Sequence, residues 1–187
     1  MAEARAGATI DDLYRVDGKA EIVGGELVLM SPTGFLPARA GAAVYRSLLT
    51  YEEESCLGYA LPDNAAFVVD LPHRKSFSPD AAFYVGAPID AKFLEGAPLF
   101  AAEIRSEGDY GPTAEKDLAK KRADYFAAGT RIVWDADVLR DELIRSYSAE
   151  GPKEPRIFRR GEIADAEPAL PGWRMPVDDL FKGSRKR

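Results

Sequence analysis

The chain has 187 residues, of which 46% are hydrophobic and 30% charged, and its formal net charge at pH 7 is −6. This length and composition predict one folded domain over residues 1–187, with residues 1–8 and 183–187 as frayed tails. The acidic balance argues against a protein that coats nucleic acid electrostatically, but it does not exclude a nuclease, because an acidic metal site is negative until its cation binds.

The first half of the chain predicts a short helix, a hairpin and a long helix. Thr9 is a candidate N-cap for the short helix. The segment Glu21–Met30 predicts a β-hairpin, because two apolar runs flank the Gly24-Gly25 pair, which suits a two-residue turn. After a loop over Ser31–Pro37, apolar residues recur at helical spacing and predict a helix over Ala38–Ser55.

The second half predicts strands and one further long helix. The expected elements are strands over Tyr59–Val69, Asp80–Val85 and Leu99–Ile104, a helix over Thr113–Ala128, strands over Arg131–Asp135 and Glu142–Ser148, and a short helical turn over Val177–Phe181. We expect Pro152–Gly172 to be irregular, apart from a short strand at Arg156–Arg159. This order predicts an α/β fold in which helices flank a mixed β-sheet.

One lysine of the predicted helix over Thr113–Ala128 falls on its core-facing side. At ~100° per residue, Lys121 lies about 60° from Leu118 and about 40° from Tyr125, inside the apolar stripe. Burying an ammonium group is costly unless anions meet it. The helical geometry leaves two interpretations open: Lys121 meets carboxylates, or its stem runs along the stripe and carries the charge into solvent.

Two acidic residues upstream are candidate partners for this lysine. Glu103 interrupts the apolar run LFAAEI, which is typical of a central strand covered on both faces, so its carboxylate should be paired, protonated or bound to a metal. Asp80 follows a proline at the start of a predicted strand, where an ordinary turn residue is the alternative. Because side chains alternate along a strand, Arg105 shares a face with Glu103 and supplies a second cation.

Two carboxylates and a lysine gathered on one sheet are typical of a metal-dependent phosphodiesterase. Mg²⁺ takes oxygen ligands, commonly one or two carboxylates together with water and substrate phosphate, and Mn²⁺ is the expected substitute. A lysine or arginine beside such an ion can orient the attacking water and stabilise the negative charge that develops on the phosphate. The sequence therefore predicts Mg²⁺-dependent hydrolysis of phosphodiester bonds.

Other chemistries lack the residues they need. The only cysteine, Cys56, excludes an internal disulfide and a cysteine-built zinc site, and we expect it to be an ordinary packing residue. The only histidine, His73, falls in a loop expected on the surface, so the ligand sets of zinc enzymes and a Ser-His-Asp triad are missing. The chain has no apolar run that could span a bilayer and no signal-peptide pattern, so we expect a cytoplasmic protein without a membrane partner.

Five segments resemble the motifs of one family in their order and spacing. They are AEIVGGELVLMSP (residues 20–32), SPDAAFYV (78–85), PLFAAEIRS (98–106), KRADYFAAGTRIVWDAD (121–137) and LPGWRMPVDDLF (170–181). Together they are similar to the Uma-type restriction endonuclease family, a domain of unknown function within the PD-(D/E)xK nuclease superfamily. The resemblance covers nearly the whole chain.

The resemblance implies a restriction-endonuclease-like fold with an N-terminal β-hairpin and a Mg²⁺-dependent endonuclease that cleaves DNA, commonly as a homodimer. It implies Asp80 and Glu103 as the metal ligands. It also implies that Lys121 is the catalytic lysine, moved from the glutamate strand to the neighbouring helix. Glu21 matches a glutamate near the start of the family pattern and is a candidate accessory acid.

Three departures from the family pattern keep an alternative open. The chain has Pro37-Ala38 where the family often has a histidine, and Ser106-Glu107 where Ser-Pro is usual. Arg105 occupies the position of the lysine in the superfamily's original motif, so Arg105 and Lys121 compete for the role of catalytic cation. The alternative is an inactive nuclease fold that binds nucleic acid or protein.

Overall fold

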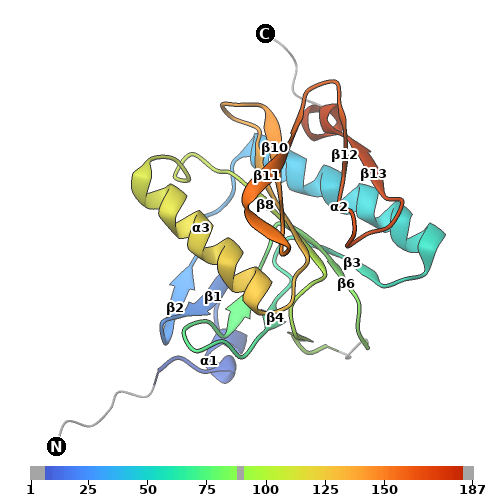
Figure 1. The fold of residues 1–187 in the computed structure, drawn as a ribbon. Helices are drawn as coiled ribbons and strands as arrows, with labels where there is room; N and C mark the ends of the chain where they lie inside the picture. The colour runs from blue at the N-terminus through green and yellow to red at the C-terminus, as the bar shows by residue number, and fades with distance from the viewer. Residues whose placement is uncertain (1–6, 88–90, 183–187) are drawn as a thin grey trace, which may run out of the picture.

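A six-stranded mixed sheet forms the centre of the molecule, in the order β11-β10-β9-β8-β6-β3 (Figure 1). The computed structural model describes residues 7–87 and 91–182. The strands are β3 (Tyr59–Pro62), β6 (Ala81–Tyr84), β8 (Phe100–Ile104), β9 (Ile132–Asp137), β10 (Leu143–Ser148) and β11 (Gly151–Arg159). Strands β8 and β9 run parallel, whereas the other neighbouring pairs are antiparallel. The mixed sheet and its flanking helices confirm the predicted fold class.

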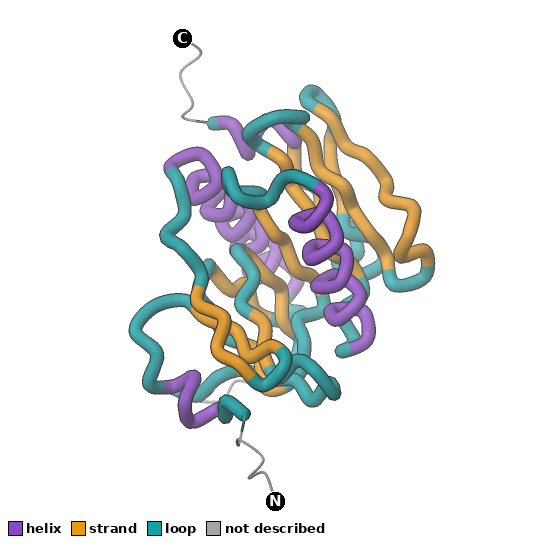
Figure 2. The backbone as a smooth tube through the Cα atoms, turned by 90° about the vertical axis from the view of Figure 1, so that its left-hand side faces the viewer, coloured by secondary structure: helices purple, strands orange, loops and turns teal. Residues whose placement is uncertain are grey.

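Two long helices cover opposite faces of this sheet (Figure 2). Helix α2 (Phe35–Ser55) and a C-terminal segment pack on one face. That segment contains β12 (Ile163–Asp165), β13 (Arg174–Pro176) and the 3-10 helix η1 (Val177–Phe181). The larger core lies here, and within it the ring of Trp134 lies 5.2 Å from that of Phe100 and 4.9 Å from that of Trp173. Burial of these aromatic rings anchors the C-terminal segment to the sheet.

Helix α3 (Pro112–Ala127) covers the opposite face mainly through charged side chains. Tyr125 is fully buried and stacks on Phe77 at 4.0 Å, whereas Leu118, expected in the core, is only partly buried. Ion pairs connect the helix to the rest of the fold, among them Glu115–Arg105, Lys121–Glu103, Arg122–Asp135 and Asp124–Arg74. The position of α3 is therefore specified by charge matching as much as by apolar contact.

The N-terminal part forms a layer beside the main sheet. Thr9 caps α1 (Ile10–Tyr14), and the predicted hairpin consists of β1 (Ala20–Val23) and β2 (Glu26–Leu29). Its turn residues Gly24 and Gly25 have φ of 62° and 79°, the left-handed values that a tight two-residue turn requires. A small sheet of β4 (Phe67–Val68), β5 (Ser76–Phe77) and β7 (Leu94–Glu95) lies next to it.

The predicted tails lie mostly outside the described residues. Residues 1–6 and 183–187 are not described, so the prediction of fraying is untested for them. At the inner end of the N-terminal tail, the N–H of Ala8 donates to the carbonyl of Gly25 at 2.7 Å. Residue 8 is therefore attached to the hairpin turn.

Two strand predictions differ from the structure. The segment Tyr59–Val69 is not one strand, because the chain turns at Asn64, whose φ is 67°, and places β3 and β4 in different sheets. The segment Pro152–Gly172 is not irregular, because it contains all but the first residue of β11 and the whole of β12. Most side chains of β11 are exposed, so an edge strand formed without the alternating pattern that sequence analysis detects.

Helix α2 and its ends also differ from prediction. The helix begins at Phe35 instead of Ala38, because Pro37 lies in the first turn, where its missing N–H is tolerated. Cys56 is exposed and ends the helix in a left-handed conformation with φ of 56°, so the prediction of a packing residue was wrong. Among the described residues, no helix has the length and apolarity to cross a bilayer.

Candidate active site

The two predicted metal ligands lie next to each other where β8 pairs with the start of β6. The N–H of Asp80 donates to the carbonyl of Ala102 at 3.0 Å, and Asp80 Oδ2 accepts the N–H of Ile104 at 2.7 Å. Glu103 lies between these two residues of β8, on the face covered by α3. The side chains of Asp80 and Glu103 are 16% and 18% exposed, so the acid pair is partly open to solvent.

The carboxyl of Glu103 has a raised pKa. Burial is the main cause, and the negative charges of Asp80 and Glu21 add to it, whereas the Lys121 ammonium opposes it. The hydroxyl of Tyr125 donates to Glu103 Oε1 at 2.6 Å and fixes the orientation of the carboxylate. A nearby dication would favour the ionised form of this group.

Lys121 reaches the acids from α3, as its helical position predicts. Its Nζ lies 2.9 Å from the carboxylate of Glu103 and 2.9 Å from Oε1 of Glu21, and the side chain is 16% exposed. Burial lowers the pKa of this ammonium, but the two carboxylates outweigh burial and hold the pKa above its usual value. The sequence left two interpretations open for Lys121. In the structure Lys121 pairs with carboxylates and does not carry its charge into solvent.

Glu21 is more deeply buried than the other acids. Its side chain is 4% exposed; Oε1 accepts the N–H of Ser78 at 2.9 Å, and Oε2 lies 2.5 Å from Nη1 of Arg74. Burial raises the pKa of Glu21, but Lys121, Arg74 and the Ser78 N–H together hold it below its ordinary value. Glu21 is therefore an ionised partner that fixes Lys121 beside Glu103.

Arg105 shares the face of Glu103, as predicted, but its contacts are elsewhere. Its Nε and Nη2 donate to the two oxygens of Asp135 at 2.6 and 2.7 Å, and its guanidinium also pairs with Glu115. The side chain is 4% exposed. Arg105 attaches the first turn of α3 to the sheet, and Lys121 is the cation that contacts Glu103.

Lys19 is a site residue that the sequence analysis missed. Its Nζ lies 2.8 Å from Oδ1 of Asp80 and 2.6 Å from Oδ1 of Asp63. Burial lowers the pKa of Lys19, but the charges of Asp80 and Glu103 raise it to a net value above the usual one. A signal was available in the sequence, because Lys19 and Glu21 are two residues apart at the start of a strand and so share a face.

A further row of charges extends from this site toward the surface. Arg74 bridges Glu21 and Asp124, with its Nε 2.8 Å from Oδ2 of Asp124. His73 Nε2 lies 2.7 Å from the other oxygen of Asp124, and the His73 side chain is 45% exposed, in keeping with its predicted surface loop. Asp124 follows Lys121 by three residues on α3, so helical spacing alone places both on one face.

The donor set fits a hard divalent cation. Within residues 7–87 and 91–182, no three His, Cys, Asp or Glu side chains gather closely enough to hold a metal by themselves. Two carboxylates at a partly open site instead match Mg²⁺ or Mn²⁺, which complete their shell with water and substrate phosphate. The nitrogen and sulfur ligands of a zinc site are absent from the acid pair.

Helix α2 supports Asp80 from the other side of the sheet. A Cβ atom placed on Gly41 would lie 3.4 Å from the carbonyl oxygen and 3.6 Å from the Cβ of Asp80, which is ordinary contact. Gly41→Ala should therefore leave Asp80 in place, whereas the longer side chain of Gly41→Leu should displace Asp80 and weaken any Mn²⁺ binding that depends on it. Calorimetric titration of both variants with Mn²⁺ tests this, and equal affinities would contradict it.

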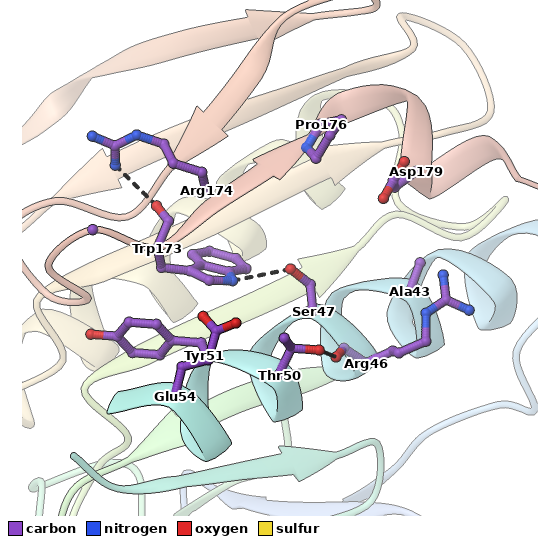
Figure 3. Close-up of a pocket in the computed structure, with 11 residues that line it drawn as sticks. Ala43, Arg46, Ser47, Thr50, Tyr51, Glu54, Trp173, Arg174, Pro176 and Asp179 are labelled. Carbon is purple, nitrogen blue, oxygen red and sulfur yellow. Dashed lines mark hydrogen bonds between the residues drawn. The ribbon is translucent and has the colours of Figure 1, made fainter. Parts of the chain in front are cut away.

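A groove of about 470 Å³ lies between α2 and the C-terminal segment, on the face away from the acid pair (Figure 3). At its floor the indole N–H of Trp173 donates to Ser47 Oγ at 3.1 Å. Charges of both signs line it, from Arg46 and Arg174 to Glu54. The groove lacks a gathered set of acids and is distinct from the candidate active site.

The chain is similar to known proteins in both sequence and fold. The profile of the family Uma2, described as "Putative restriction endonuclease", matches residues 9–178. The structure is similar to a crystal structure described as a putative nuclease belonging to DUF820 from Anabaena variabilis, with a TM-score of 0.72 and 15% sequence identity, covering 93% of this chain and 97% of that one. No curated protein matches the chain in sequence. Because the family profile spans nearly the whole sequence, the chain belongs to the Uma2 family of restriction-endonuclease-like proteins.

Proposed function

We propose that the protein is a Mg²⁺-dependent endonuclease that hydrolyses phosphodiester bonds in DNA. The observation that carries the proposal is the meeting of Lys121 with Glu103, directly beside Asp80, in a partly open site. Family membership and the nuclease-like fold support a nuclease in general. Mg²⁺ as cofactor and DNA as substrate are the further steps that the donor set and the family pattern favour.

Asp80 and Glu103 would hold the cation. Asp80 would offer Oδ1, since Oδ2 already accepts the N–H of Ile104. When bound, Mg²⁺ lowers the pKa of a coordinated water and neutralises charge on the phosphate. Tyr125 keeps the carboxylate of Glu103 in one orientation through its hydrogen bond to Oε1.

Lys121 would act on the water and the phosphate. Its ammonium group lies beside Glu103, where it can orient the attacking water and stabilise the negative charge that develops on the phosphate oxygens. Glu21 holds the same ammonium from the other side and prevents it from swinging into solvent. We further expect a homodimer, because cleavage of two strands commonly uses two sites.

Metal binding tests the proposal directly. In a calorimetric titration, the wild-type protein is expected to bind Mn²⁺. Asp80→Asn is expected to raise the dissociation constant for Mn²⁺ tenfold or more, which corresponds to a loss of about 1.4 kcal/mol of binding free energy. Asp70→Asn is the matched control, because Asp70 is an exposed aspartate whose partner is the surface residue Lys75.

Two outcomes would contradict the enzyme proposal. The first is wild-type protein that takes up no Mn²⁺ or Mg²⁺. The second is uptake that Asp80→Asn leaves unchanged. Either would favour the alternative of an inactive nuclease fold that serves as a binding module.

A further inference from the structure

Both oxygens of Asp80 are engaged by other groups of the chain. Oδ2 accepts the backbone N–H of Ile104 at 2.7 Å, and Oδ1 lies 2.8 Å from the ammonium of Lys19. The N–H is fixed by the strand, because Ile104 is the last residue of β8. The ammonium is at the end of a four-carbon stem with free rotation. Oδ1 is therefore the oxygen that a cation can reach, provided Lys19 leaves it.

Lys121 is held more firmly than Lys19. It contacts both Glu103 and Glu21, and Glu21 is itself fixed by Arg74 and by the N–H of Ser78. Of these two carboxylates Glu21 is buried and Glu103 is partly buried, and the fixed Glu21 keeps the ammonium of Lys121 in place. Lys19, by contrast, has an exposed carboxylate as one of its two partners.

Asp63 gives Lys19 another carboxylate. Its Oδ1 lies 2.6 Å from Lys19 Nζ, and its side chain is 50% exposed. The same oxygen accepts the N–H of Asn64 at 2.7 Å, which keeps the carboxylate oriented in the turn after β3. Lys19 can therefore give up Asp80 and remain paired with Asp63.

We propose that Lys19 competes with the divalent cation for Oδ1 of Asp80, and that it moves onto Asp63 when the cation binds. This inference rests on the proposed function, because it concerns the same metal ligands. A monovalent and a divalent cation repel each other at contact distance, so an ammonium on Oδ1 disfavours a divalent cation on the same oxygen. The apparent affinity for metal then depends on the fraction of molecules in which Lys19 pairs with Asp80 and the fraction in which it pairs only with Asp63.

Calorimetric titration with Mn²⁺ at fixed pH tests the competition. Lys19→Met retains the length and apolar stem of the side chain without its charge, and it is expected to tighten Mn²⁺ binding at least tenfold. Asp63→Asn removes the alternative partner, so Lys19 stays on Asp80 and binding is expected to weaken at least threefold. Lys75→Met, at an exposed lysine paired with Asp70, is the control and should leave the affinity unchanged.

A double variant separates competition from a general effect of charge. If Asp63 acts through Lys19, Asp63→Asn has no effect on affinity in the Lys19→Met background. If Asp63 merely attracts cations, Asp63→Asn weakens Mn²⁺ binding equally in the wild-type and Lys19→Met proteins, and the competition is overturned. Unchanged affinity in Lys19→Met overturns it as well. Should Lys19→Met not fold, Asp63→Asn at its exposed position still decides, because unchanged affinity there is also incompatible with the proposal.

The failure of this inference is distinguishable from failure of the proposed function. If Mn²⁺ affinity falls in Asp80→Asn but is unchanged in Lys19→Met, only the competition is contradicted. Absence of Mn²⁺ binding from the wild type and from Lys19→Met alike would overturn both proposals. A second measurement, urea unfolding with and without Mn²⁺, should give a larger metal-induced rise in stability for Lys19→Met than for the wild type.

Discussion

Lys121→Met is expected to slow Mg²⁺-dependent cleavage of plasmid DNA by about 10²–10³-fold, the usual loss when one group that stabilises a transition state is removed. The ammonium of Lys121 lies 2.9 Å from the carboxylate of Glu103 and 2.9 Å from that of Glu21, and within the described part of the chain no other lysine or arginine pairs with both acids. Methionine fills the same space without the charge. Nicking of supercoiled plasmid, measured over time, gives the rate.

Metal binding should not fall in parallel with cleavage. Removing a positive charge beside Glu103 favours a dication, so Mn²⁺ affinity in Lys121→Met should equal or exceed that of the wild type. Lys116→Met, on the exposed side of the same helix, is the control and should cleave normally. Wild-type rates in Lys121→Met would return the catalytic role to Arg105, and equal residual cleavage in every variant would reveal a contaminating nuclease.

Arg74→Met is expected to lower the free energy of unfolding by about 3–5 kcal/mol, because it leaves buried carboxylates without their cation. Arg74 is 5% exposed and pairs with both Glu21 and Asp124, whose side chains are 4% and 5% exposed. Urea denaturation followed by circular dichroism measures the change. Adding Asp124→Asn to the Arg74→Met protein should restore part of the loss, since one of the uncompensated charges disappears.

A surface arginine is the matched control for this experiment. Arg15 pairs with Asp12, but their side chains are 73% and 42% exposed. Arg15→Met should therefore change stability by less than about 1 kcal/mol. Equal small losses in both arginine variants would show that the row of charges behind the active site contributes little to folding.

The part of the site that sequence analysis could predict is the part with a local signal. Lys121 is recognisable because helical periodicity is a property of neighbouring residues, and Glu103 because a carboxylate interrupts an apolar strand. Arg74 carries no such signal, and the spacing of Lys19 and Glu21 indicates a shared strand face without indicating the distant partner Asp80. Lys19 meets Asp80 61 residues later in the chain and Arg74 meets Asp124 50 residues later, so only the folded structure places them together.

The elements of the fold also divide into those that neighbouring residues determine and those that depend on contacts between distant parts of the chain. The hairpin turn at Gly24-Gly25 and the capped start of α1 at Thr9 depend on residues within one turn, and both were predicted. The strands β4, β5 and β7 have two residues each, too few for any periodicity, and exist only because the chain brings them side by side. Strand β11 was missed because solvent faces most of its side chains.

The two borders of the main sheet constrain how copies of the chain can assemble. One border is β11, which carries Pro152 and Pro155 together with charged residues, and the other is β3, a four-residue strand that ends in Pro62. A proline offers no N–H to an incoming strand, and charges on such a border resist pairing. A continuous twelve-strand sheet across two subunits is therefore disfavoured, and any homodimer of this chain would join through helices and loops.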